Sequence, residues 1–210
     1  IEFYGYERVN TWSFRLGTEA AGKVRFNGTL EEYIKFYDTT ARAVAKVLPG
    51  AGFGPYNLAG GLVEHYLGVT EHAKKEGLRM DWIANSTYVI AKMSGGVLNL
   101  SAMDPDARAA SLGKGWDEVA RAAVNGENLP REIHEYGWFL TNEYGIASSE
   151  PGARGAAGNF HYIINLLGEG LDRLYQWGVF DSVKSGGDTL RFLNAQGWLW
   201  SILEYARGAD

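Results

Sequence analysis

Short apolar segments alternate with amphipathic helical patterns along the chain, and this alternation constrains the fold more than any other feature. The segments with the character of strands are residues 11–17, 51–56, 80–88, 131–134 and 173–180. The helical patterns cover residues 30–48, 61–76, 106–124, 155–171 and 194–206. Strand followed by helix, repeated in this way, is typical of a parallel α/β sheet.

The clearest helix is predicted for residues 30–48. Thr29 suits the N-cap position, and Glu32, three residues later, can complete a capping box. Apolar residues within the segment recur on one helical face, which predicts that this face packs against a core. Pro49 and Gly50 then end the helix.

The number of strand–helix units limits the architecture to two candidates. About five units fit into the 210 residues. A complete eight-stranded α/β barrel typically needs about 250 residues, so the chain can form only part of one. A doubly wound sheet of five strands would fit the length. However, Gly17, Thr18 and Glu19 follow the first strand where such a sheet would carry a glycine-rich phosphate loop. Length favours the open sheet, and the residues at the strand ends favour part of a barrel.

The composition excludes several classes of protein. The net charge is −5 and the 20 Lys and Arg residues are scattered, so no basic face for nucleic acid is indicated. The lack of cysteine excludes disulfide scaffolds, thiol catalysis and cysteine-type zinc sites. No stretch reaches the ~18 apolar residues of a membrane helix, and no motif indicates a metal or an organic cofactor. Aromatic residues reach 13 %, which suits a sugar-binding cleft.

Two glutamates are the strongest candidates for catalysis. Glu19 follows the first predicted strand and Glu135 follows the fourth, at the end where α/β barrels place their active sites. They are separated by about three strand–helix units, and strands three apart in a barrel face one another across its mouth. Glycosidases cleave the glycosidic bond with two carboxyl groups that lie on opposite sides of a cleft. Taken singly, each residue is better explained as a solvated loop acid, whereas the pairing, the spacing and the adjacent aromatic residues favour catalysis.

Several segments resemble family 39 of the glycoside hydrolases, retaining (β/α)8 enzymes that include β-xylosidases and α-L-iduronidases. Residues 4–19, YGYERVNTWSFRLGTE, are similar to the family segment that leads into the fourth barrel strand. Residues 26–49, FNGTLEEYIKFYDTTARAVAKVLP, are similar to the helix that follows it, and residues 52–60, GFGPYNLAG, to the next strand. IHEYGW at residues 133–138 falls where the family has its Thr-Glu-Trp nucleophile strand. The match is dense up to residue 60 and patchy beyond it.

The resemblance implies roles for both glutamates. Glu19 matches the general acid/base and Glu135 the nucleophile of a retaining mechanism. The acid needs an environment that raises its pKa, and the apolar side chains of Trp12, Phe14 and Leu16 could help to provide one.

The resemblance also implies sugar-binding residues. Tyr88 looks like the tyrosine that hydrogen-bonds the nucleophile in this clan, and Trp177 like the tryptophan platform beneath the sugar. Tyr136 and Trp138, just beyond Glu135, are candidates for a stacking wall. Each of these four aromatic residues could instead belong to the hydrophobic core.

Two positions depart from the family pattern. Thr18 stands where the family has the asparagine that holds the sugar 2-hydroxyl, which implies a different substrate or weaker catalysis. The His-x-Tyr pattern of the sixth strand is changed to Ser86, Thr87 and Tyr88.

These observations predict a retaining glycoside hydrolase that acts on an oligo- or polysaccharide. A non-catalytic carbohydrate-binding relative and an unrelated α/β protein remain the alternatives. We expect residues 1–210 to form one catalytic barrel domain that lacks its first three strand–helix units. Because five strands cannot close an eight-stranded barrel, a second chain or a further segment would complete it. The compartment is not fixed, although polysaccharide hydrolases are usually exported, which favours a secreted or periplasmic protein.

Overall fold

A computed structural model describes residues 1–21, 25–59, 63–94, 97–99, 104–141, 147–149, 153–176, 180–185, 188–193 and 195–207. The chain divides into two compact units. The first comprises residues 1–87, 112–134 and 171–174, and the second comprises residues 88–111, 135–170 and 175–210. Within the described part of the chain, no helix combines the length and the apolar character needed to cross a membrane.

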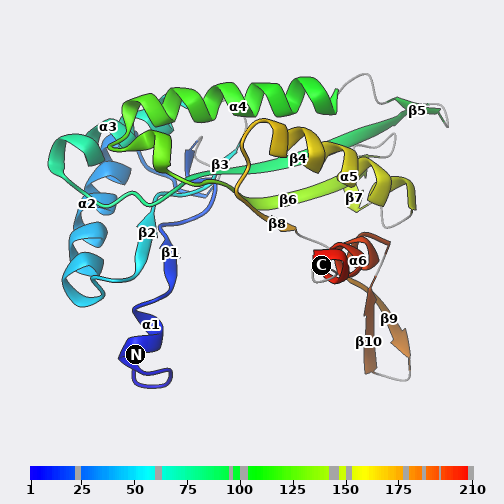
Figure 1. The fold of residues 1–210 in the computed structure, drawn as a ribbon, viewed down its shortest axis with the longest axis horizontal. Coiled ribbons are helices and arrows are strands. Elements are labelled where there is room, and N and C mark those ends of the chain that lie inside the picture. The colour runs from blue at the N-terminus through cyan, green and yellow to red at the C-terminus, as the bar shows by residue number, and fades with distance from the viewer. Residues whose placement is uncertain are drawn as a thin grey trace. The chain divides into compact units, whose positions relative to one another are not determined.

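The first unit opens with helix α1 (Tyr6–Val9) and a parallel pair of strands, β1 (Ser13–Arg15) and β2 (Gly52–Gly54). Figure 1 shows the two strands side by side, with helix α2 (Leu30–Val47) connecting them in the chain. Phe14 lies opposite Phe53 in the register. This strand–helix–strand unit confirms the parallel arrangement that the alternation predicted.

Helix α2 begins as predicted. The Thr29 side chain accepts a hydrogen bond from the Glu32 amide, and the Glu32 carboxylate accepts one from the Thr29 amide, so both halves of the capping box are present. Tyr33, Tyr37 and Ala41 form the buried face of the helix. The helix therefore directs two tyrosines into the core at successive turns.

A small hydrophobic cluster joins the end of α1 to the segment between α2 and β2. Its buried members are Val9, Leu48 and Ala51, and Trp12 and Phe14 pack against it. The aromatic residues that precede Glu19 in the sequence therefore contribute to packing near α1.

The strands and helices that follow β2 in the chain continue the alternation. Strand β3 (Leu58–Ala59) pairs in parallel with β4 (Ile83–Ser94), and helix α3 (Val63–Glu76) lies between them in the chain. Helix α4 (Pro105–Ala122) and the short 3₁₀ helix η2 (Gly126–Asn128) lead to β6 (Arg131–Thr141). Strand β8 (Arg173–Gln176) pairs with β6, and strands β3, β4 and β6 are neighbours in that order.

Two strands run further than the sequence predicted. Strand β4 continues to Ser94 rather than ending at Tyr88, and β6 continues to Thr141 rather than ending at His134. Each extension is paired, β4 with β5 (Val97–Asn99) and β6 with β7 (Ala147–Ser149), both antiparallel. Backbone hydrogen bonds to these added edge strands explain why the extended conformation persists.

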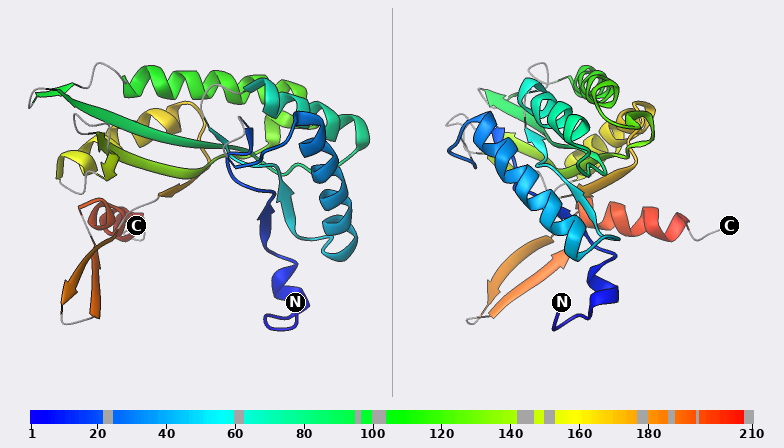
Figure 2. Two further views of the ribbon diagram at one scale, coloured as in Figure 1. Left: turned by 180° about the vertical axis from the view of Figure 1, so that it is seen from behind. Right: turned by 90° about the vertical axis from the view of Figure 1, so that its left-hand side faces the viewer.

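The C-terminal part of the second unit contains an element that the sequence analysis missed. Strands β9 (Phe180–Ser185) and β10 (Asp188–Leu193) form an antiparallel hairpin, visible in Figure 2 next to helix α6 (Ala195–Arg207). The predicted single strand over residues 173–180 is thus replaced by β8 and the start of β9. Helix α5 (Ala153–Gly168) contacts α6.

Candidate active site

The loop that follows β1 carries Glu19 in an unusual backbone conformation. Glu19 has φ = 45°, in the left-handed region, and Gly17 two residues earlier has φ = 83°. Glycine adopts such angles freely, whereas for glutamate they are uncommon and costly. The Glu19 side chain is half-buried. The surrounding contacts must therefore hold this turn in place.

The base of the loop is anchored to neighbouring elements by backbone and tyrosine hydrogen bonds. The Leu16 amide donates to the Gly54 carbonyl at 3.1 Å, extending the pairing of β1 with β2. The Tyr33 hydroxyl, from helix α2, donates to the Leu16 carbonyl at 2.7 Å. The same hydroxyl accepts from the Tyr56 amide at 3.2 Å. Tyr33 therefore ties the end of β1 to the segment that follows β2.

Burial keeps these tyrosines in their neutral, hydrogen-bonding form. Tyr33 is 1 % exposed, and burial raises the pKa of its phenol above the usual value. Burial likewise raises the pKa of the fully buried Tyr56, whose hydroxyl lies 2.6 Å from Nδ1 of His65. Burial lowers the pKa of His65, which favours a neutral imidazole that accepts the tyrosine proton in this bond. The side chains of Tyr33, Tyr56 and His65 are therefore uncharged and hydrogen-bonded.

A second set of contacts joins side chains and includes Thr18, the residue next to Glu19. Thr18 Oγ1 donates to Asn57 Oδ1 at 2.8 Å, and Asn57 Nδ2 donates to the Ser86 hydroxyl oxygen. We call these three residues the polar bridge. Asn57 is completely buried and Ser86 is 5 % exposed, so the bridge lies mostly away from solvent.

Asn57 was missed at the level of sequence. Its hydrogen-bond partners are 39 and 29 residues away along the chain, and no local pattern connects them. The available signal was an asparagine directly after a buried strand, because a polar side chain at the end of a parallel strand lies where catalytic sites form.

The structure places Glu135 inside a strand and not after one. It lies within β6, half-buried, between His134 and the fully buried Tyr136. The prediction that the strand ends at His134 was therefore wrong. The backbone at Glu135 is held by the strand and needs no special turn.

Charged side chains secure the beginning of β6. Arg173 Nη1 donates to Glu132 Oε1 at 2.8 Å, and the other carboxylate oxygen lies 2.7 Å from His134 Nε2. Glu132 is only 3 % exposed, and its partners satisfy the buried charge. Because Arg173 belongs to β8, this contact joins two neighbouring strands.

Tyr136 has a different environment from the one expected for a stacking wall. Its side chain is fully buried, and its hydroxyl donates to Asn159 Oδ1 of helix α5 at 2.6 Å. Its ring stacks on Tyr162 of the same helix, with the two centroids 6.0 Å apart. Burial against α5 leaves no free face for a sugar, so Tyr136 is a packing residue in this structure.

The side chains of the other three aromatic residues predicted for the site lie outside the described part of the chain. Tyr88 is in β4 and Trp138 is in β6, and the side chains of both are outside the described part of the chain. Trp177 lies outside the described residues altogether. Glu19 and Thr18 belong to the first unit, whereas Tyr88, Glu135 and Trp138 belong to the second.

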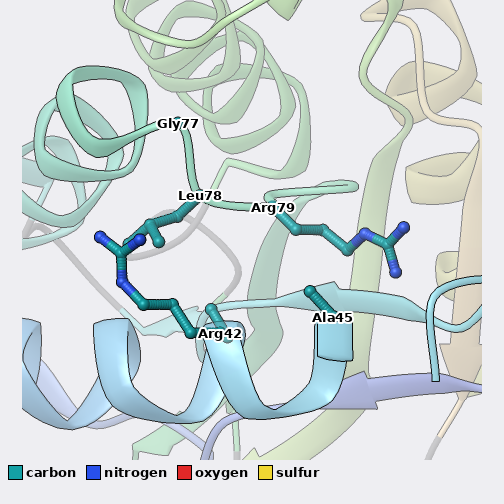
Figure 3. Close-up of a pocket in the computed structure, with 6 residues that line it drawn as sticks. Arg42, Ala45, Gly77, Leu78 and Arg79 are labelled. Carbon is teal, nitrogen blue, oxygen red and sulfur yellow. The ribbon is translucent and has the colours of Figure 1, made fainter. Parts of the chain in front are cut away.

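A pocket of about 370 Å³ lies between α2 and the segment after α3 (Figure 3). In the figure the guanidinium groups of Arg42 and Arg79 point away from each other. Arg42 is paired with Asp38, and Arg79 donates to the carbonyls of Pro49 and Ala51. Both arginines therefore support the fold. Over the residues with described positions, no cluster of three or more metal-binding side chains occurs.

Comparison with known proteins agrees with this arrangement of strands and helices. The chain is 32 % identical over 90 residues to a β-xylosidase of Geobacillus stearothermophilus, which covers 42 % of this chain and 18 % of that enzyme. Its fold is similar to the crystal structure of a glucosidase from Croceicoccus marinus, with a TM-score of 0.56 over 79 % of this chain and 32 % of the other. The sequence identity in that second comparison is 19 %, so it establishes a shared fold alone.

The chain spans less than a third of the length of both relatives. A comparison with whole families gives the broadest match and covers the β1 loop, the polar bridge and Glu135 together. Residues 1–175 match the family described as glycosyl hydrolases family 39. The chain belongs to that family.

Proposed function

We propose that the protein is a retaining glycoside hydrolase in which Glu19 is the acid/base and Glu135 the nucleophile. The observation that carries the proposal is the family match over residues 1–175, which includes both glutamates. The positions of the two residues support the proposal. Glu19 lies on the loop after the parallel strand β1, and Glu135 lies within strand β6.

The proposed reaction proceeds in two displacements. Glu135 attacks the anomeric carbon as a carboxylate while Glu19 protonates the departing glycosidic oxygen, which gives a covalent glycosyl-enzyme. Glu19, now ionised, then takes a proton from water as the water attacks the same carbon and releases Glu135. Such a mechanism requires carboxyl groups separated by about 5–5.5 Å.

We propose a carbohydrate with a xylose-type sugar at the cleavage site as the first substrate to test. The support is the similarity to a β-xylosidase, which does not extend to most of that enzyme's length. Trp138 and Trp177 are proposed to contact the sugar and Tyr88 to hydrogen-bond Glu135. Tyr136 is left out because it packs against α5.

We further propose that residues 1–210 supply the fourth to eighth strands of a (β/α)8 barrel. The support is the number of strand–helix units, together with the parallel pairings of β1 with β2 and of β3 with β4. The first three strands would come from another segment or a second chain.

The test is an assay of the intact natural protein on nitrophenyl glycosides, beginning with the β-xyloside and β-glucoside. Proton NMR of the first-formed sugar should show retention of the anomeric configuration. The product of the opposite configuration would contradict the double displacement. No hydrolysis of any glycoside in the panel would contradict the enzymatic proposal.

A second function is supported by Thr18, which replaces the asparagine expected beside the acid/base. In this alternative the protein binds oligosaccharides without cleaving them. Calorimetric titration with xylo-oligosaccharides, followed by chromatography after prolonged incubation, separates the two. Binding with intact oligosaccharide would favour the binding protein.

A further inference from the structure

We infer that Asn57 is a positioning residue for Glu19, acting through Thr18 to hold the acid/base loop in its reactive conformation. The inference rests on the proposed function, and it adds a residue for which neither the motif nor the sequence spacing provides a role.

The geometry of the polar bridge assigns a direction to each hydrogen bond. Asn57 Oδ1 accepts the hydroxyl proton of Thr18 at 2.8 Å, and Asn57 Nδ2 donates to the Ser86 oxygen. If the Asn57 amide were rotated by half a turn, Nδ2 would face Thr18 and Oδ1 would face Ser86, and both hydrogen bonds would run in the opposite direction. Because Asn57 is fully buried and both ends of its amide are engaged, the side chain is fixed between β4 and the β1 loop.

The position of Thr18 makes this contact relevant to Glu19. Thr18 lies between Gly17, with φ = 83°, and Glu19, with φ = 45°. The two left-handed residues define a tight turn that glutamate adopts only at a cost. Tyr33 and Gly54 hold the turn at Leu16, whereas Asn57 holds it at the residue next to Glu19. Loss of the Asn57 contact would free the turn at the end that carries the carboxyl group.

The bridge also defines what Thr18 can offer to a sugar. A threonine hydroxyl has one proton and two acceptor lone pairs, and here the proton is directed to Asn57. Toward a substrate, Thr18 is then an acceptor only. It would accept a hydrogen bond from a sugar hydroxyl but could not donate one to it.

The experiment compares two aryl glycosides that carry the same sugar, the one that the wild-type protein hydrolyses fastest in the panel. A phenyl group leaves poorly and needs protonation by the general acid, whereas a dinitrophenyl group leaves readily without it. The ratio of kcat/KM for the two substrates therefore measures how well Glu19 is placed, because a lost sugar contact lowers both values equally.

The variant is Asn57→Leu in the intact protein, which keeps the approximate shape of the side chain and removes both hydrogen bonds. We expect kcat/KM for the phenyl glycoside to fall by about tenfold to a hundredfold, as for a misplaced catalytic group. The dinitrophenyl glycoside should change by less than about threefold, since its cleavage requires little acid catalysis.

The matched control is Asn10→Leu. Asn10 makes a comparable contact at the other end of β1, where its Oδ1 accepts from the Gly50 amide at 2.9 Å. This variant should leave the ratio of the two kcat/KM values unchanged.

A second pair of variants keeps the test decisive if Asn57→Leu fails to fold. Thr18→Val removes the same hydrogen bond from the other side, and Thr18→Ser retains the hydroxyl. We expect Thr18→Val to lower kcat/KM selectively for the phenyl glycoside. Thr18→Ser should keep the wild-type ratio of the two kcat/KM values. An unchanged ratio in Asn57→Leu, or in Thr18→Val where the first does not fold, would overturn the inference while leaving the proposed function intact. A wild-type protein that cleaves neither substrate would overturn both.

Discussion

The two glutamates proposed for catalysis are held by different means. Glu19 lies on a turn with a left-handed backbone, fixed by contacts from Tyr33 and Asn57. Glu135 lies inside an eleven-residue strand whose regular backbone positions it without a specialised turn. A strand supplies position through many repeated hydrogen bonds, whereas a turn depends on a few individual ones.

This difference predicts which substitutions can displace each carboxylate. Single side-chain substitutions around the Glu19 turn should alter its placement, because each removes a large share of what holds it. Around Glu135, comparable substitutions should have little effect, since the strand remains. The first two predictions below test the two proposed roles, and the third tests the support of the Glu19 turn, in order of decreasing expected effect.

Glu135→Ala should lower kcat/KM for both the phenyl and the dinitrophenyl glycoside. Without the nucleophile, no covalent intermediate forms, whatever the leaving group. We expect a loss of at least about 10⁴-fold, as is seen when a catalytic nucleophile is removed. Steady-state kinetics on both substrates measure it, and a variant that keeps full activity would exclude Glu135 as the nucleophile.

Glu19→Ala should instead discriminate between the same substrates. Loss of a general acid costs about 10²–10⁴-fold where the leaving group requires protonation. We expect such a loss for the phenyl glycoside and a much smaller one for the dinitrophenyl glycoside. Equal losses on the two substrates would argue that Glu19 has another role, and would remove the contrast with Glu135.

Tyr33→Phe should lower both stability and activity by weakening the base of the Glu19 turn. The change removes the bond to the Leu16 carbonyl and leaves the buried Tyr56 amide without its acceptor. We expect a loss of about 2–3 kcal/mol in the free energy of unfolding, from the lost bond and the unsatisfied amide together. Chemical denaturation monitored by tryptophan fluorescence measures it.

Tyr37→Phe is the matched control for this change. Tyr37 lies on the same helix, one turn later, and its hydroxyl donates to the Arg79 carbonyl away from the Glu19 turn. It should lower stability by about 1–2 kcal/mol and leave kcat unchanged. A fall in kcat for Tyr37→Phe equal to that for Tyr33→Phe would show that stability alone explains the loss.

Local sequence patterns predicted the five longer helices well, although the four-residue α1 was missed. Helix α2 begins at its predicted capping box, and the helices at residues 63–76, 105–122, 153–168 and 195–207 lie close to their predicted ranges. Helix formation depends on caps and on side chains three or four residues apart, and these are visible in a linear sequence.

Strand ends were predicted less well because a strand is stabilised by its partner. The extension of β6 to Thr141 depends on pairing with β7, and the hairpin of β9 with β10 was missed. The glycines at positions 186 and 187 were the available signal, since two glycines between strand-like segments favour a hairpin.

The features of the candidate site also separate into those that the sequence predicts and those that depend on the tertiary structure. The sequence by itself determined the two glutamates, the family resemblance and the departure at Thr18, because these are properties of residue type and order. Only the tertiary structure decided that Asn57 joins Thr18 to Ser86, that Tyr136 is buried against α5, and that Glu19 adopts a left-handed turn. Each of these features arises from contacts between residues far apart in the chain, whose energies depend on packing and burial that no local pattern encodes.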